Sequence, residues 1–234
     1  SRVSNAAGTT SGAVSFMERF SNTTREVAQN GRRGALMLTI DIAHPDVEDF
    51  ITIKQDLTKV TGANVSIRLS DEFMKAVENN EEYTHRWPID SDSPKITKTV
   101  NAQELWQTII KCAHNTAEPG LIFWDRQHYY STSSVYPEYK NTSTNPCSEI
   151  AMQGGDSCRL IALNLFNFVE NPFTKNARFN MVKFYETTYE AQRLMDDLVD
   201  LEVAAIDKIL AKVDDDDEPE HIKSVEKETW ELLK

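Results

Sequence analysis

The sequence predicts an α/β fold in which helices cover a sheet of parallel strands. Two observations lead to this prediction. Short apolar runs typical of strands alternate along the chain with segments whose apolar residues recur at helical spacing. Such alternation is typical of parallel strands joined by helical crossovers. The chain has 234 residues, of which 40% are hydrophobic and 26% charged, so it is long enough to bury one substantial core.

The first part of the chain follows this alternation closely. Residues 1–12 are rich in Gly, Ser, Thr and Asn and predict a loop. Ser70 stands where a helix N-cap is expected, directly after an apolar run. The elements expected here are helices at 13–29, 44–55 and 71–80 and strands at 35–42 and 64–69.

The second part contains a longer irregular stretch. Residues 126–160 show little periodicity and are too many for a simple connector, which indicates a functional loop. The acidic run at 214–218 is typical of a solvated loop. The regular elements expected here are an excursion or hairpin at 81–100, helices at 101–117 and 179–213, and strands at 120–125 and 161–169.

Charge and composition exclude some classes of function. The formal net charge of −12, with scattered Lys and Arg, disfavours binding to DNA or RNA polymers, although local arginines can still hold a small nucleotide. No apolar run is long enough to span a membrane, and no secretory signal precedes the three cysteines. We therefore expect a cytoplasmic protein with free or catalytic thiols, and a segment of a longer chain because its first residue is not Met.

The stretch 145–168 carries the residue types of one chemistry. Cys147 stands between Asn145 and Glu149, and Cys158 follows eleven residues later. A thiol can form a thiyl radical, a carboxylate can accept a hydroxyl proton, an amide can orient that hydroxyl, and a further thiol can supply reducing equivalents. Burial as a small hydrophobic residue is disfavoured for Cys147 by its polar neighbours, is equally plausible for Cys158, and is favoured for Cys112 on its amphipathic helix.

The cysteines allow two other interpretations. Cys147 and Cys158 lack the spacing of a zinc site and no second ligand pair follows, so no metal site is expected. A cysteine hydrolase would need a histidine base, and His114 and His128 show no diagnostic spacing. That second alternative stays open.

The segments NPCSEI at 145–150 and DSCRLIALNLF at 156–166 resemble the active-site finger loop of ribonucleotide reductases, especially the adenosylcobalamin-dependent kind. Residues 11–20, 31–51 and 64–77 resemble the same family in the same order. The resemblance implies part of a ten-stranded α/β barrel with a central finger loop at about 141–160. It places the partial barrel at 1–213, with an acidic loop and the start of a further helix at 214–234.

The resemblance also implies roles for individual residues. Cys147 would be the thiyl radical that removes the 3′ hydrogen of a ribonucleotide, Glu149 would accept the 3′-hydroxyl proton, and Asn145 would hydrogen-bond the substrate. Cys158 would be one of a redox pair whose other cysteine lies upstream in the family. The further substrate-binding residues implied are Thr10 and Ser11 in the loop 8–12, and Pro146 and Ser148 beside the cysteine.

A deoxynucleotide effector site is implied as well. Residues 26–37 resemble the first loop of the family's specificity site, and residues 55–65 resemble the second. The effector-binding residues implied are Arg32, Arg33, Gly34 and Lys59. Adjacent arginines flanked by glycines could be surface charges, but guanidinium groups and backbone amides in such a turn suit phosphate groups, so effector binding is favoured.

The function implied is thiyl-radical reduction of ribonucleotides to 2′-deoxyribonucleotides for DNA synthesis, with a catalytically inactive nucleotide-binding module as the alternative. Pro146 favours adenosylcobalamin as the cofactor over a radical supplied by a separate metallosubunit. The partners implied are the ribonucleotide, the effector, the remaining part of the catalytic subunit, a thioredoxin-type reductant and a second copy. Helices at 14–28 and 179–213 would contribute to that homodimer, and the choice between diphosphate and triphosphate substrates stays open.

Overall fold

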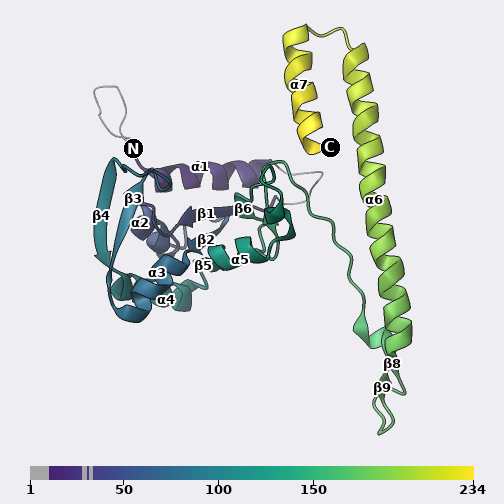
Figure 1. Cartoon of the computed structure of the whole chain (residues 1–234), viewed down its shortest axis with the longest axis horizontal. Coiled ribbons are helices and arrows are strands. Elements are labelled where there is room, and N and C mark those ends of the chain that lie inside the picture. The colour runs from purple at the N-terminus through teal and green to yellow at the C-terminus, as the bar shows by residue number, and fades with distance from the viewer. Residues whose placement is uncertain (1–10, 28–30, 32–33) are drawn as a thin grey trace. The chain divides into compact units, whose positions relative to one another are not determined.

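The computed structural model describes residues 11–27, 31 and 34–234, and Figure 1 shows its elements along the chain. The chain divides into two compact units. The first unit ends at Gly154 and the second begins at Gly155.

A parallel sheet forms the centre of the first unit. Its strands are β1 (Met37–Asp41), β2 (Asn64–Leu69) and β5 (Gly120–Phe123), with β2 in the middle. Both pairs are parallel, and the register places Thr39 beside Ser66 and Asp41 beside Arg68. This sheet confirms the predicted α/β class and all three strands expected in this unit.

Helices follow the strands of the first unit, as the periodicity predicts. Ser70 Oγ accepts a hydrogen bond from Phe73 N at 3.1 Å, and Asn101 Oδ1 accepts one from Glu104 N at 2.9 Å, so each side chain caps the helix that follows it. The helices are α1 (Ala13–Glu26), α2 (Val47–Thr52) continued by a 3₁₀ turn at Ile53–Gln55, α3 (Asp71–Asn79), α4 (Ala102–Thr116) and α5 (Trp124–Tyr130). Helix α5 was not expected, because the sequence predicted a strand through 125 and an irregular loop after it.

The hairpin expected at 81–100 is present. Strands β3 (Glu82–Trp87) and β4 (Ile96–Asn101) pair antiparallel. They lie at the opposite end of the first unit from α5 (Figure 1).

The core of the first unit lies on one face of β2. Val65, Ile67 and Leu69 point to this face, and each is at most 1% exposed. They pack in one cluster with residues of α2, α3 and α4. Cys112 of α4 belongs to that cluster, which confirms the prediction that it is a core residue, and burial raises the pKa of its thiol.

The second unit is mostly helical. Its elements are a 3₁₀ turn at Leu165–Phe168, β8 (Val169–Glu170), β9 (Arg178–Phe179), α6 (Met181–Asp215) and α7 (Glu220–Leu233). The long helix is confirmed, and it continues through the first two residues of the acidic run. In the described part of the chain no helix is both long and apolar enough to cross a membrane.

The strand predicted at 161–169 is wrong. Asn164 Oδ1 accepts a hydrogen bond from Phe166 N at 3.1 Å and begins the 3₁₀ turn. A side chain that bonds the backbone locally in this way competes with strand pairing. Only Val169 and Glu170 pair as a strand, with Phe179 and Arg178.

The described residues form no closed barrel. Besides the three-stranded sheet, residues 11–27, 31 and 34–234 contain only two-stranded ribbons. The structure therefore supports the α/β class, whereas the ten-stranded barrel stays an expectation from resemblance.

Candidate active site

Cys147 lies at the tip of a short antiparallel hairpin that we call the Cys147 hairpin, residues 141–152. Its strands are β6 (Ser143–Thr144) and β7 (Ala151–Met152). Thr142 N donates to Met152 O at 2.9 Å on the outer side of this ladder, and Asn145 N donates to Ile150 O at 3.1 Å on the inner side. The hydrogen bonds thus leave residues 146–149 as the turn.

Asn145 holds the turn together. Its Oδ1 accepts a hydrogen bond from Ile150 N at 3.1 Å, and its backbone oxygen accepts one from Ser148 N at 3.0 Å. Ser148 has a positive φ of 69°, which reverses the chain direction within the turn. With Asn145 Oδ1 engaged by the backbone, the amide Nδ2 is the side-chain group left to bond a ligand, as a donor.

The thiol and the carboxylate of the turn are open to solvent. Cys147 and Glu149 are exposed, Pro146 and Ser148 are half-buried, and Asn145 is 9% exposed. The structure therefore brings a thiol, a carboxylate and an anchored amide together on one turn. These groups can exchange a hydrogen atom and a proton with a ligand that docks there.

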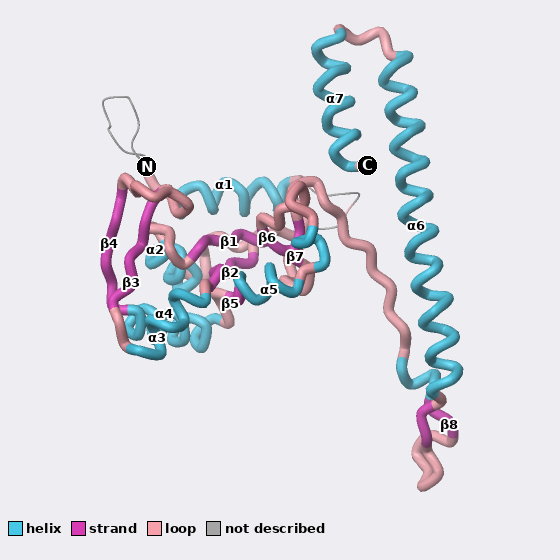
Figure 2. Tube along the Cα trace, in the orientation of Figure 1, coloured by secondary structure: helices cyan, strands magenta, loops and turns pink. Residues whose placement is uncertain are grey.

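The hairpin rests on the sheet through side chains of β1 and β2. Thr39 Oγ1 and Ser143 Oγ are 3.1 Å apart, and Arg68 Nη1 donates to Thr142 O at 3.0 Å. A longer contact joins Asn64 Nδ2 to Pro146 O at 3.4 Å. In Figure 2, β6 lies beside β1 and β2, in agreement with these contacts.

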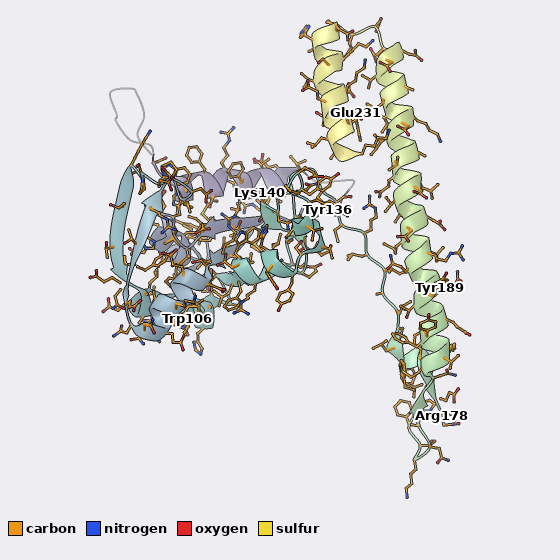
Figure 3. The ribbon with its side chains drawn as sticks, in the orientation of Figure 1. Trp106, Tyr136, Lys140, Arg178, Tyr189 and Glu231 are labelled. Atoms are coloured by element: carbon orange, nitrogen blue, oxygen red, sulfur yellow. The ribbon has the colours of Figure 1, made fainter. Side chains whose placement is uncertain are left out.

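The approach to the hairpin is anchored by a small polar cluster. Asn141 is 4% exposed, and its Nδ2 donates to Ser131 Oγ at 3.0 Å while its Oδ1 accepts from Ser133 Oγ at 3.1 Å. Figure 3 labels Tyr136 and Lys140 on the intervening loop. The irregular stretch singled out in the sequence is thus folded back onto itself before the hairpin begins.

A groove adjoins the tip of the hairpin. Its volume is about 620 Å³, and it lies between the end of α1, the segments that precede β1 and β2, the first residue of β2, and Pro146. Gly34 lines it, so one predicted effector residue and one predicted substrate residue share this groove. The lining residues are Thr24, Arg25, Gly34, Ala35, Leu36, Thr61, Gly62, Ala63, Asn64 and Pro146.

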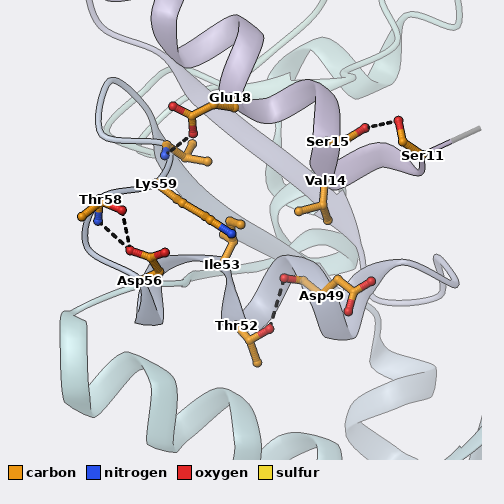
Figure 4. A pocket seen from close by; sticks show the side chains of 11 residues that line it. Ser11, Val14, Ser15, Glu18, Asp49, Thr52, Ile53, Asp56, Thr58 and Lys59 are labelled. Atoms are coloured by element: carbon orange, nitrogen blue, oxygen red, sulfur yellow. Dashed lines mark hydrogen bonds between the residues drawn. The ribbon is translucent and has the colours of Figure 1, made fainter.

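A second cavity contains two further predicted residues. Lys59 and Ser11 line a space of about 710 Å³ between α1, α2 and the loop that follows α2 (Figure 4). The carboxylates of Glu18, Asp49 and Asp56 line it as well. Hydrogen bonds from Thr58 hold the pKa of Asp56 below its usual value, so that carboxylate stays ionised. Three carboxylates around one lysine disfavour a phosphate group there.

Other predicted residues lie elsewhere. Cys158 is exposed and belongs to the second unit, in the segment that precedes the 3₁₀ turn. Thr10, Arg32 and Arg33 lie outside the described residues. The contacts made by Thr39, Asn64 and Arg68 were not expected from the sequence, because nothing in the local pattern of a strand indicates which distant loop will rest on it.

Comparison with known proteins identifies the relatives of this chain. The family model described as "Ribonucleotide reductase, barrel domain" matches residues 1–216. The vitamin B12-dependent ribonucleoside-diphosphate reductase of Thermoplasma acidophilum is 33% identical over 209 residues, which cover 88% of this chain and 26% of the relative. That of Mycobacterium tuberculosis strain H37Rv is also 33% identical, over 202 residues, 86% of this chain and 27% of the relative.

A more distant relative is the ribonucleoside-diphosphate reductase large chain of Neurospora crassa. It is 26% identical over 230 residues, which cover 86% of this chain and 24% of the relative. The chain thus spans about a quarter of the length of these curated relatives.

Proposed function

The chain belongs to the ribonucleotide reductase family, and from that premise we propose that it supplies the radical-bearing hairpin of a catalytic subunit. The reaction proposed is the reduction of ribonucleotides to 2′-deoxyribonucleotides. The remaining part of the subunit would complete the barrel and the substrate site.

One observation carries this proposal. Asn145, Cys147 and Glu149 lie on a single turn in which the thiol and the carboxylate are exposed and the amide is anchored through Ile150 N. A radical reaction needs its hydrogen-abstracting atom and its base to meet one sugar ring, and neighbouring residues on a pinned turn can do so. The inactive-module alternative gives no reason for these three groups to share a turn.

The chemical step balances with the groups proposed. The Cys147 thiyl radical takes the 3′ hydrogen atom and becomes a thiol, while Glu149 accepts the proton of the 3′ hydroxyl. The 2′ hydroxyl then leaves as water with one proton from a dithiol. The dithiol also supplies two electrons and the hydrogen that replaces the hydroxyl at the 2′ carbon as it becomes a disulfide, and Glu149 returns its proton to the 3′ oxygen. Cys158 would be one of these thiols, and the other would come from the rest of the enzyme. Cys147 finally returns a hydrogen atom to the 3′ carbon and is again a radical.

The radical source proposed is adenosylcobalamin, because several relatives are named as vitamin B12-dependent enzymes. When bound, this cofactor would supply the radical that oxidises Cys147. The exposed thiol fits a source that docks against the hairpin from outside the chain, and a separate metallosubunit would meet the same requirement.

Regulation and assembly complete the proposal. The deoxynucleotide effector would bind through Arg32, Arg33 and Gly34, and the groove that Gly34 shares with Pro146 would connect the effector segment to the hairpin. The acidic surroundings of Lys59 make it the weaker member of this set. A second copy of the subunit and a thioredoxin-type reductant are the further partners proposed.

The test is ribonucleotide reduction by this chain combined with the remaining part of the catalytic subunit, with dithiothreitol as reductant and with or without adenosylcobalamin. Cys147→Ala should abolish product while effector binding persists. Cys112→Ala serves as the control, since that thiol is packed in the core. Product made equally well by Cys147→Ala would overturn the radical assignment. If the wild-type chain gave no product with any radical source, the inactive module would be favoured.

A further inference from the structure

We propose that Arg68 is a positioning residue that holds the Cys147 hairpin against the sheet and so fixes where the thiol meets its substrate. The inference deepens the proposed function, because it concerns the same hairpin. It rests on the difference between the two faces of β2, of which one contacts the hairpin and the other packs in the core.

The strand β2 presents a polar face to the hairpin. Side chains alternate along a strand, so Asn64, Ser66 and Arg68 point to the face opposite Val65, Ile67 and Leu69. The register adds Thr39 and Asp41 of β1 to this polar face. The hairpin therefore rests on hydrogen-bonding groups, whereas the other face is apolar.

The polar side chains follow the hairpin from its root toward its tip. Arg68 bonds Thr142 O, Thr39 meets the Ser143 hydroxyl, and Asn64 reaches Pro146 O, the residue before Cys147. The first two contacts are 3.0 and 3.1 Å long, whereas the third is 3.4 Å. Hydrogen bonds weaken as they lengthen, and those to charged groups are stronger than neutral ones. Arg68 is therefore the strongest of the three tethers.

The guanidinium group of Arg68 is itself fixed in place. It lies over the Trp124 ring at 5.1 Å from the ring centre, and its Nη2 is 3.9 Å from Asp41 Oδ2. Asp41 is oriented in turn by a hydrogen bond of 2.9 Å from Ala43 N to its Oδ1. The tether is thus held by three elements, β1, β2 and α5.

Stability alone does not account for this arrangement. Arg68 Nε is buried, and it has no hydrogen-bond partner among the described residues. An unsatisfied buried donor costs about 1–3 kcal/mol. An arginine that carries this cost while its Nη1 bonds the root of the hairpin is better explained by the position it gives the hairpin.

Lysine cannot reproduce the arrangement. A planar guanidinium can stack on Trp124 and direct one nitrogen to Thr142 O and another toward Asp41, whereas an ammonium group is a compact charge without a flat face. Arg68→Lys should therefore keep the charge and still loosen the hairpin. Arg68→Met should loosen it further.

Hydrogen exchange of this chain tests the inference without any need for reductase activity. In the wild type the amides of Thr142, Asn145 and Ile150 are hydrogen-bonded within the hairpin and should be protected. Arg68→Met should raise their exchange rates about tenfold, with Arg68→Lys in between, because a lost charged hydrogen bond is worth about 1.5 kcal/mol or more. Amides of α3 and α4 should keep their protection.

Two controls separate positioning from general destabilisation. Arg178 is 75% exposed and pairs with Glu170 within the second unit, so Arg178→Met removes a surface arginine that bonds no described residue of the hairpin and should leave the hairpin's exchange unchanged. Alkylation of Cys112, which is buried, reports opening of the whole core. Unchanged hairpin exchange in Arg68→Met, or faster exchange that spreads equally to α3, α4 and Cys112, would overturn the inference.

The completed enzyme gives a second measurement. Because loss of position at the reacting atom lowers the rate of the chemical step, Arg68→Met should reduce kcat by about tenfold to a hundredfold with little change in KM. A rise in KM at unchanged kcat would contradict a positioning role. Should the enzyme prove inactive altogether, hydrogen exchange would still decide the role of Arg68, so the two proposals fail separately.

Discussion

The two faces of β2 are covered by different parts of the chain and held by different forces. On one face Val65, Ile67 and Leu69 pack into the cluster formed with α2, α3 and α4. On the other face Asn64 and Arg68 contact the Cys147 hairpin through hydrogen bonds. The strand is therefore both part of the core and the support of the candidate active site.

The two faces therefore have different roles, since the apolar face stabilises the unit and the polar face positions the hairpin. Apolar packing is strong in sum but tolerates small shifts of the elements that pack, whereas hydrogen bonds have narrow distances and angles. The apolar face can thus supply the free energy that keeps β2 in place, and the polar face can use that fixed strand to place a loop. Changes on the first face should unfold the unit, and changes on the second should move only the hairpin.

The largest effect on stability should come from the apolar face. Ile67 is fully buried, and Ile67→Ala would leave a cavity among the helices, lowering the free energy of unfolding by about 3–4 kcal/mol. Urea denaturation followed by circular dichroism measures this loss. A loss below about 1 kcal/mol would contradict the assignment of this face to the core.

The sequence predicts the strand β2 and its two faces, but not the hairpin that covers the polar face. The strand at 64–69 could be predicted from its apolar residues and from Ser70 directly after it, since both signals are local. The partners of Arg68 and Thr39 could not, because Thr142 and Ser143 lie 74 and 104 residues away. Periodicity shows that a strand has two faces but not which distant loop covers each of them.

The same limit explains the incorrect strand at 161–169. Its apolar residues favour a strand, but Ile161, Leu165 and Phe166 are between 50% and 56% exposed, and no strand among the described residues pairs with them. A segment becomes a strand only where backbone partners are present. The residue types of the Cys147 turn, in contrast, were evident from the sequence because Asn145, Cys147 and Glu149 are close in the chain itself.

Substitution of Lys54 should have the next largest effect on stability, because this residue joins the loop before β2 to the segment before β5. Its Nζ donates to Val60 O at 2.6 Å and to Ala63 O at 2.7 Å, and it lies 3.2 Å from Glu118 Oε2. Glu118 Oε1 accepts in turn from Val65 N at 2.9 Å. Lys54→Met would leave these acceptors buried without their donor, at a cost of about 3 kcal/mol.

Thermal or urea unfolding of Lys54→Met checks this prediction. Lys98 is the matched control, since its ion pair with Glu48 is about half exposed, and Lys98→Met should cost less than about 0.5 kcal/mol. Equal losses in the two variants would mean that the buried lysine contributes no more than a surface charge.

Mild acid should lower the free energy of unfolding of the first unit through His85. This residue is fully buried, its Nδ1 bonds Ile42 O at 2.9 Å, and burial lowers its pKa below the usual value. As the pH falls below about 6.5, the His85 side chain therefore takes up a proton in the unfolded chain, whereas in the folded chain it stays neutral to a lower pH. Stability should be constant at higher pH and should decrease from there downward.

The measurement is the free energy of unfolding between pH 7.5 and pH 5, above the range in which carboxylates titrate. His44 contributes in the same direction, since burial lowers its pKa too, so His85→Asn should reduce the acid-induced loss without abolishing it. A wild-type stability that rises on acidification over this range would show that the sign is wrong.

The smallest effect should come from the hydroxyl pair that joins the polar face of the sheet to the hairpin. Thr39 Oγ1 and Ser143 Oγ are 3.1 Å apart and part-buried, so Thr39→Val and Ser143→Ala should show a coupling energy of about 0.5–1 kcal/mol in a double-mutant cycle. Thr84 and Thr99 form the matched control, because their hydroxyls are 3.5 Å apart and exposed, and their coupling should be near zero.

Equal coupling energies in the two cycles would mean that the contact between Thr39 and Ser143 holds the hairpin no more firmly than an exposed hydroxyl pair holds a surface ribbon. A larger coupling for Thr39 and Ser143, with no loss of core protection in either single variant, would show that hydrogen bonding to the polar face seats the hairpin independently of the packing on the other face.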